Sequence, residues 1–308
     1  MNKIMTRGDL LKTITAMTAL SSLGLKLHSK GVGTQGNENL RKEYNFKLSL
    51  NAYSFNQPLS DGSMDLFDLL DFCSDQGFDA VDPTGYYFPG YPEVPSDEYL
   101  YEFKRAAFLK GLAISGTGIR NEFVDPDEQK RRHDVQLIKQ WIRAASKMGA
   151  PILRIFTGHH DMQEYTREQT LEWMIKDIKE CVDYGSKHGI VVAVQNHNAF
   201  IKTAVQTREL MEGVDSKWFG LILDTGSFRQ GDPYQEVADA IPWAVSWQLK
   251  ELIYVNSIAE NIDLDKIFNI IKAAGYRGYI PIETLGPGDP FVKVSDFLKQ
   301  VRLSLAIS

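Results

Sequence analysis

Four hydrogen-bonding side chains follow one another directly at the end of an apolar segment of the sequence. The segment IVVAV, residues 190–194, is apolar and mostly β-branched, and it is followed by Gln195, Asn196, His197 and Asn198. The apolar run is typical of a strand that is covered on both faces. Because polar groups are costly to bury without partners, this cluster predicts that the end of the strand binds something.

Seven other apolar segments also end in side chains that can bind or react. In chain order, these are Asn51 and Tyr53, then Asp82, then Thr117, Arg120 and Asn121, then Arg154 with His159 and His160, and after the segment of Gln195 come Asp224, Gln248 with Lys250, and Glu283. Each has an ordinary structural explanation, such as Asp224 capping a turn. Taken together, oxygen-bearing side chains from the last four segments predict a site for a hard or borderline divalent cation.

The segments that carry these residues alternate with longer amphipathic ones from Phe46 onward. We expect strands at residues 46–53, 78–82, 112–118, 151–156, 190–195, 219–224, 244–250 and 278–283, each followed by a helix. Ser96 and Asp125 are expected to cap two of the helices, with Pro126 just inside the second. Eight such units over about 260 residues predict an α/β fold of the (β/α)₈ barrel type. An open doubly wound sheet is the alternative, for which the glycines of SGTGIRN are weak evidence.

Composition narrows the functional classes. The chain has 308 residues and a net charge of −6, without a basic tract, which argues against nucleic acid as a partner. Its two cysteines, Cys73 and Cys181, have no metal-binding or disulfide-framework spacing.

The first 44 residues differ in kind from the rest, which form the barrel at residues 45–308. Lys3, Arg7 and Lys12 precede a mildly apolar run and then a stretch rich in Gly, Asn and Gln. This order predicts an export signal and linker, and so a periplasmic protein. If the segment is instead an amphipathic tail, the protein stays in the cytoplasm.

Several stretches resemble one family. IVVAVQNHNAF, GLILDTGS, SWQLKE and YIPIETLG resemble the last four strand ends of the xylose-isomerase-like superfamily of sugar isomerases and epimerases. SLNAYSFN, DPTGYYFPGYP and RGYIPIET are similar to the subgroup labelled sugar phosphate isomerase/epimerase. The resemblance spans residues 46–304. It implies one divalent metal ion (Mg, Mn, Zn or Co) at positions occupied here by Gln195, Asp224, Gln248 and Glu283.

Two of these four positions depart from the family pattern. Gln248 stands where the family has a histidine, and Gln195 stands where it has the first of two proton-transferring glutamates. A glutamine cannot act as a general base, so Gln195 is expected to be a neutral metal ligand. The catalytic residues are then expected to be Glu283, Lys250 and a histidine, His197 in the first place or else His159 or His160. The substrate is expected to contact Asn51, Tyr53, Arg120, Asn121, Arg154 and His159.

The resemblance and its departures leave three functions open. The first is a metal-dependent carbohydrate isomerase or epimerase that abstracts a proton next to a sugar carbonyl. The second is a metal-dependent lyase, dehydratase or hydratase acting on a keto-sugar or 3-keto-glycoside. The third is a non-catalytic carbohydrate-binding barrel. In all three the partner is a small carbohydrate, no nucleic acid is bound, and assembly into a homo-oligomer is left open.

Overall fold

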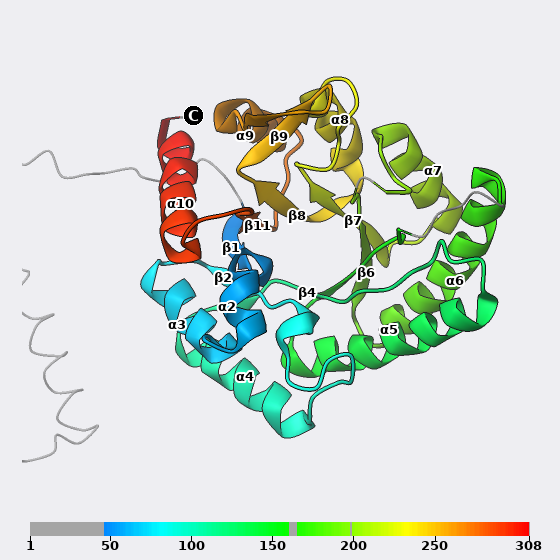
Figure 1. Cartoon of the computed structure of the whole chain (residues 1–308), viewed down its shortest axis with the longest axis horizontal. Coiled ribbons are helices and arrows are strands. Elements are labelled where there is room, and N and C mark those ends of the chain that lie inside the picture. Colours follow the sequence, from blue (N-terminus) through cyan, green and yellow to red (C-terminus); the bar gives the residue numbers. More distant parts are fainter. Residues whose placement is uncertain (1–45, 160–164, 198, 308) are drawn as a thin grey trace, which may run out of the picture. The chain divides into compact units, whose positions relative to one another are not determined.

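Parallel strands surround the centre of the computed structural model, which describes residues 46–159, 165–197 and 199–307 (Figure 1). The strands of the main sheet are β1 (Lys47–Asn51), β2 (Ala80–Asp82), β3 (Ala113–Ile114), β4 (Thr117–Gly118), β5 (Ile152–Ile155), β6 (Val191–Gln195), β7 (Phe219–Asp224), β8 (Ala244–Lys250) and β11 (Tyr279–Glu283). Each expected strand contains one of these strands or, for residues 112–118, two.

The sheet is nearly closed into a barrel, and the segment expected as its third strand forms two short strands, β3 and β4. The strand order is β3-β2-β1-β11-β8-β7-β6-β5-β4, so β3 and β4 lie at opposite ends of the ladder. Only Ser115 and Gly116 separate them in the chain, and Thr84 near β2 forms a parallel bridge with Gly118 of β4. One continuous segment therefore supplies both edges of the sheet, and the predicted (β/α)₈ barrel is confirmed.

The helices cover the outside of the sheet (Figure 1). They are α3 (Leu66–Asp75), α4 (Asp97–Leu109), α5 (Glu128–Met148), α6 (Arg167–Lys187), α7 (Ala204–Val214), α8 (Pro233–Ala240), α9 (Leu264–Ala273) and α10 (Pro290–Ile307). The expected cap Ser96 accepts a hydrogen bond from the backbone of Tyr99. The expected cap Asp125 is wrong: α5 is capped by Asp127, whose own backbone N–H is held by the Asp125 carboxylate.

A short helix and a β-hairpin were not expected from the sequence. The short helix α2 (Asn56–Asp61) follows β1, and β9 (Leu252–Val255) forms an antiparallel hairpin with β10 (Ile258–Asn261). The turn of the hairpin contains Asn256 and Ser257, both at positive φ. Two-residue hairpin turns with positive φ usually contain a glycine, and this turn has none, so the sequence gives little indication of it.

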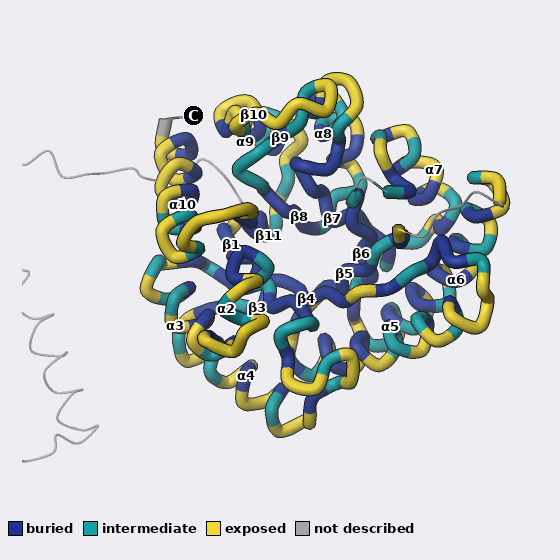
Figure 2. The backbone as a smooth tube through the Cα atoms, viewed as in Figure 1, coloured by how far each residue is buried: buried dark blue, intermediate teal, exposed yellow. Residues whose placement is uncertain are grey.

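The polar side chains at the strand ends point to the inside of the barrel, as the burial pattern along the strands indicates. Figure 2 shows buried residues along the strands and on the inner sides of the helices. Ile152, Ala193 and Ile222 form a small separate apolar cluster on three neighbouring strands. Side chains two residues apart in a strand share a face, so the residues two positions on, Arg154, Gln195 and Asp224, point into the same interior nearer the carboxyl ends.

The predicted export segment, residues 1–44, lies outside the described residues and stays a prediction. Among the residues that the structure describes, no helix has the length and apolar character needed to span a bilayer.

Candidate active site

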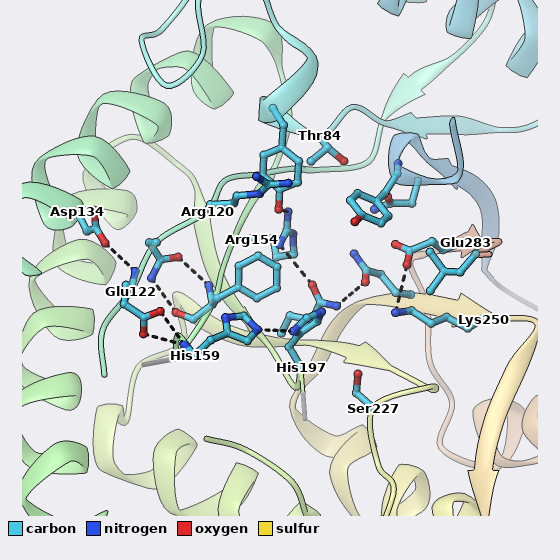
Figure 3. Close-up of a pocket in the computed structure, with 18 of the residues that line it drawn as sticks. Thr84, Arg120, Glu122, Asp134, Arg154, His159, His197, Ser227, Lys250 and Glu283 are labelled. Carbon is cyan, nitrogen blue, oxygen red and sulfur yellow. Dashed lines mark hydrogen bonds and ion pairs between the residues drawn. The ribbon is translucent and has the colours of Figure 1, made fainter. Parts of the chain in front are cut away.

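A cavity of about 790 Å³ opens at the carboxyl ends of the strands (Figure 3). Eleven predicted site residues line it, namely Asn51, Tyr53, Arg120, Asn121, Arg154, His159, Gln195, His197, Gln248, Lys250 and Glu283, whereas Asp82, Thr117 and Asp224 do not. In Figure 3, Lys250 and Glu283 lie on one side and Glu122 and Asp134 on the other. The expected convergence of strand-end residues on one site is therefore present in the geometry.

Asp224, the last residue of β7, is fully buried and accepts hydrogen bonds at both carboxylate oxygens. Its Oδ2 lies 2.7 Å from Nε2 of Gln195, 2.9 Å from Oγ of Ser227 and 3.0 Å from Nζ of Lys250. Its Oδ1 accepts the backbone N–H of Gly226 at 2.9 Å. Three of these donors are therefore on Oδ2 and one is on Oδ1.

Lys250, at the end of β8, places its ammonium group between two carboxylates. Its Nζ lies 3.0 Å from Oδ2 of Asp224 and 3.2 Å from Oε1 of Glu283, and only 12% of its side chain is exposed. The chain makes room for the lysine stem at Gly226, where an added Cβ would lie 2.9 Å from Cδ of Lys250. The glycine of LDTGS therefore serves the packing of Lys250 as well as the turn.

The three charged groups differ in how burial and their neighbours shift the pKa. Burial opposes the charge on Lys250, but Asp224 and Glu283 together raise its pKa above the usual value. Burial also opposes the charge on Asp224. The charge of Lys250 and the hydrogen bonds from Lys250 and Gln195 nonetheless lower the pKa of Asp224. For Glu283 burial prevails, and the pKa is raised despite Lys250 and Arg154. Glu283 is therefore the carboxylate that takes up a proton more readily.

Gln195, the last residue of β6, is oriented by the acceptors and donors around it. Its Nε2 donates to Oδ2 of Asp224 at 2.7 Å and to Oε1 of Gln248 at 2.5 Å. Its Oε1 lies 3.4 Å from Nη1 of Arg154. The opposite amide orientation would set an oxygen against the carboxylate of Asp224 and an NH₂ against the guanidinium of Arg154, so these two neighbours favour the orientation assigned.

The residue after Gln195 has a structural purpose. Asn196 is fully buried, donates from Nδ2 to the carbonyl of Asp224 at 3.0 Å and accepts the N–H of Asp224 at 2.8 Å. This pair of hydrogen bonds fastens the end of β7 to the end of β6.

Arg154 of β5 is a second buried cation in the cavity wall. Its Nη2 lies 2.6 Å from the hydroxyl of Tyr86, and its guanidinium stacks on the ring of Phe156 at 4.2 Å. It packs against Gly118, where an added Cβ would lie 2.4 Å from Nε of Arg154. A glycine of the SGTGIRN stretch thus provides space for an arginine, and no phosphate loop is formed.

Two of the predicted histidines touch one another. Nε2 of His159 lies 2.8 Å from Nδ1 of His197, so one ring donates a hydrogen bond to the other. Burial lowers the pKa of His197, and the positive charges of Lys250 and Arg154 act in the same direction against Asp224. His197 is therefore a neutral imidazole at neutral pH. His160 and Asn198 lie outside the described residues.

Two predicted substrate contacts are engaged with the protein itself. Asn51 accepts the backbone N–H of Tyr53 at 2.9 Å and lies 3.3 Å from the carboxylate of Asp82. Asn121 holds the backbone of Phe156 through both its amide atoms, at 2.8 Å each. Arg120 and Tyr53 have their side chains in the cavity wall, with the Arg120 guanidinium over the ring of Tyr86 at 4.4 Å.

Several residues of the cavity wall were not predicted from the sequence, namely Thr84, Tyr86, Glu122, Asp134, Phe156, Ser227, Arg229 and Leu285. Most lie in loops beyond the last residue of a strand, where strand periodicity no longer tells which way a side chain points. Tyr86 had the clearest signal, since it belongs to the aromatic stretch GYYFPGY after the second strand.

Comparison with known families agrees with this architecture. The family model described as Xylose isomerase-like TIM barrel matches residues 70–301. The chain belongs to this family.

Solved structures with the same xylose isomerase-like barrel have low sequence identity to the chain. D-psicose 3-epimerase from Clostridium cellulolyticum H10 is 15% identical with a TM-score of 0.71, covering 84% of this chain and 99% of its own. The 3-keto-D-glucoside 4-epimerase YcjR from E. coli is 16% identical with a TM-score of 0.68, covering 84% and 99%. The IolI protein, solved with a zinc atom, is 17% identical with a TM-score of 0.66, covering 84% and 96%. No curated protein matches the chain in sequence.

The side chains of this xylose isomerase-like barrel do not fit a divalent metal at the four expected positions. Both oxygens of Asp224 already accept hydrogen bonds, and Oε1 of Gln195 faces Arg154. The ammonium of Lys250 lies between Asp224 and Glu283. The cations that the described residues place at these four positions are the ammonium of Lys250 and the guanidinium of Arg154.

Proposed function

We propose that this protein is a carbohydrate isomerase or epimerase that abstracts a proton from the carbon next to the carbonyl group of a keto-sugar. The observation that carries the proposal is the placement of Glu283. Its buried carboxylate lies at a strand end in the cavity wall, 3.2 Å from the ammonium of Lys250. A base beside a fixed cation is what enolisation needs, since negative charge moves to the carbonyl oxygen as the proton leaves.

Each step of the proposed reaction has a residue for it. Glu283 takes the proton, and the electrons of the C–H bond form the C=C bond of an enediolate. Lys250 and Arg154 stabilise the oxygen that becomes negative. Return of a proton to the other face of the carbon gives an epimer, and its return to the neighbouring carbon gives an isomer.

The second proton-transfer group in this proposal is His197, paired with His159. Gln195 cannot accept a proton, so the group on its side of the cavity must come from another residue. His197 lines the cavity two residues beyond Gln195 and is a neutral imidazole, which can accept a proton and then return it to the substrate.

The wall of the cavity supports a carbohydrate as the ligand. Tyr53, Tyr86 and Phe156 present aromatic rings, and Arg120 and Arg154 present donors for hydroxyl groups. Two of the similar solved structures are of epimerases for D-psicose and for 3-keto-D-glucoside. These relatives are the reason to start with ketohexoses and 3-keto-glycosides as test substrates.

A lyase is the second candidate, and the histidine pair favours it. From the same enediolate, a substituent on the next carbon leaves with its bonding electrons, accepts a hydrogen bond from His197 and takes up the proton that Glu283 removed. The product is then an unsaturated keto-sugar rather than an epimer. The divalent metal that the family resemblance implied has no step in either reaction, because Lys250 and Arg154 supply the positive charge.

The test is incubation of the full chain with ketohexoses and 3-keto-glycosides in deuterated water, followed by NMR. We expect deuterium at a carbon next to the carbonyl, with wild type but not with Glu283→Gln. An epimer, an isomer or an unsaturated product then separates the candidate reactions. Binding of these sugars without any exchange would instead support the third function, a non-catalytic carbohydrate-binding barrel.

A further inference from the structure

We infer that the ammonium group of Lys250 is the resident cation of this active site, in the place that a divalent metal would take, and that the site binds no metal. The inference rests on the proposed function only for the role of the ammonium in the reaction. The position of the cation and the absence of metal affinity are separate claims, with a readout of their own.

The position of Lys250 carries the inference. Its Nζ is within 3.2 Å of a carboxylate oxygen from β7 and of another from β11, the strands on either side of its own strand β8. In the ladder, Lys250 is the direct neighbour of Glu283.

The carboxylates next to the lysine already have cations beside them. Asp224 and Glu283 pair with Lys250, and Arg154 acts on Glu283 and on Asp82, a third carboxylate. A divalent cation next to this ammonium would be repelled by Lys250. Asp224 and Glu283, the two carboxylates within its reach, already form ion pairs with Lys250. Moving Lys250 aside would remove both of its ion pairs.

The residues around Lys250 are shaped for the lysine. Gly226 leaves space for the stem, since an added Cβ would lie 2.9 Å from Cδ of Lys250. Thr225 accepts the backbone N–H of Lys250 at 3.0 Å. Gln195 gives Asp224 an N–H donor where a carboxylate would have added a third negative charge around one ammonium.

An ammonium differs from a metal ion in what it offers the substrate. It has three donors, of which the described residues occupy two. Because the side chain lines the cavity, the third donor is available to one substrate oxygen. The substrate is thus held at a single oxygen by this cation.

The experiment measures metal binding by the full-length protein. Wild type, Glu283→Gln, Asp224→Ala and Lys250→Ala are each incubated with Mn²⁺, Co²⁺ or Zn²⁺, desalted and analysed for bound metal. Thermal unfolding is followed with and without each ion. We expect wild type to retain no stoichiometric metal and to show no shift, and Lys250→Ala to gain metal affinity because Asp224 and Glu283 lose their cation.

The controls keep each outcome decisive. Lys139→Ala removes a lysine that pairs with Glu180 outside the site, and it should gain no metal affinity. Stoichiometric metal in wild type that is lost in Glu283→Gln or Asp224→Ala would overturn the inference. Metal held equally by wild type, Glu283→Gln and Asp224→Ala lies elsewhere and agrees with it. If Lys250→Ala does not fold, the comparison of wild type with Glu283→Gln still decides.

Failure of this inference is distinguishable from failure of the proposed function. Deuterium exchange that requires added metal would contradict the inference and support α-proton abstraction. Absence of exchange on every substrate, together with absence of bound metal, would support the inference and contradict the proposed function.

Discussion

The side-chain amide of Gln195 donates a hydrogen bond to Oδ2 of Asp224 across 2.7 Å, and both residues are buried. This contact explains why β6 ends in a glutamine. The nitrogen of the amide, and not its oxygen, faces the carboxylate. A glutamate at this position would set two carboxylates against each other.

Gln195→Glu should therefore destabilise the protein at neutral pH. We expect the free energy of unfolding to fall by about 1–3 kcal/mol, because a buried donor is replaced by a charge that repels its partner. The loss should shrink as the pH is lowered and the pair takes up a proton. Urea unfolding at several pH values measures this.

Gln235→Glu is the matched control for that substitution. Gln235 also donates to an aspartate, Asp239, at 2.8 Å, but on the exposed surface of α8. There the change should cost well under about 1 kcal/mol, since water screens exposed charges. Equal losses for the two substitutions would contradict the orientation assigned to Gln195.

Gly118→Ala should disturb the site through Arg154. The added Cβ would lie 2.4 Å from Nε of Arg154, so the guanidinium must move away from Tyr86 and Gln195. We expect a loss of about 1–3 kcal/mol in stability and slower deuterium exchange. Gly116→Ala, two residues away, meets nothing nearer than 3.7 Å and is the control. Normal exchange by Gly118→Ala would show that Arg154 has no part in catalysis.

Asp82→Asn should stabilise the protein above pH 6. Burial raises the pKa of Asp82 from 3.8 to about 6, although Arg154 and a hydrogen bond from Asn51 act against this. A raised pKa in the folded state means that stability is highest below about pH 4 and is lost as the pH rises to 6. The cost above this window is up to about 2–3 kcal/mol, since one pKa unit is worth about 1.4 kcal/mol.

Thermal or urea unfolding of wild type and Asp82→Asn from pH 4 to pH 8 checks this prediction. The two proteins should be equally stable at the acid end and diverge as the pH rises. The exposed Asp75→Asn serves as the control. A variant that is less stable than wild type at pH 8 would show that the charge on Asp82 is favourable in the folded state.

The barrel was predictable because its signals are local and repeated. Each strand is a short apolar run, and each is followed by an amphipathic helix. Once the barrel is accepted, its geometry alone brings residues such as Gln195, Gln248 and Glu283 to one end. The hairpin β9–β10 was missed because its turn contains Asn256 and Ser257 without a glycine.

The chemistry of the site was less predictable than its location. Sequence position tells which end of a strand Lys250 occupies, but its flexible side chain has many conformers. That its ammonium lies between Asp224 and Glu283 depends on Gly226, which belongs to a different strand–loop connection. The oxygen-bearing side chains predict a divalent metal, because the sequence does not show that the ammonium of Lys250 lies among them.

Glu283→Gln should abolish exchange while leaving the fold intact. Loss of a positioned general base costs about 10²–10⁴ in rate, and a glutamine retains the shape of the side chain. Glu251→Gln is the matched control, because Glu251 pairs with Lys293 at 2.8 Å outside the cavity. Circular dichroism and the rate of deuterium uptake, measured on the same samples, separate a chemical effect from unfolding.

The central claim is that Glu283 removes a proton next to a sugar carbonyl with side-chain cations as the only positive charges. The most direct measurement is the rate of deuterium incorporation into a turned-over keto-sugar, in deuterated water, after exhaustive treatment of the enzyme with a chelator. The account predicts the same rate for chelated and untreated wild type, and no measurable rate for Glu283→Gln. A rate that vanishes on chelation and returns with Mn²⁺ or Zn²⁺, or one that survives in Glu283→Gln, would contradict it.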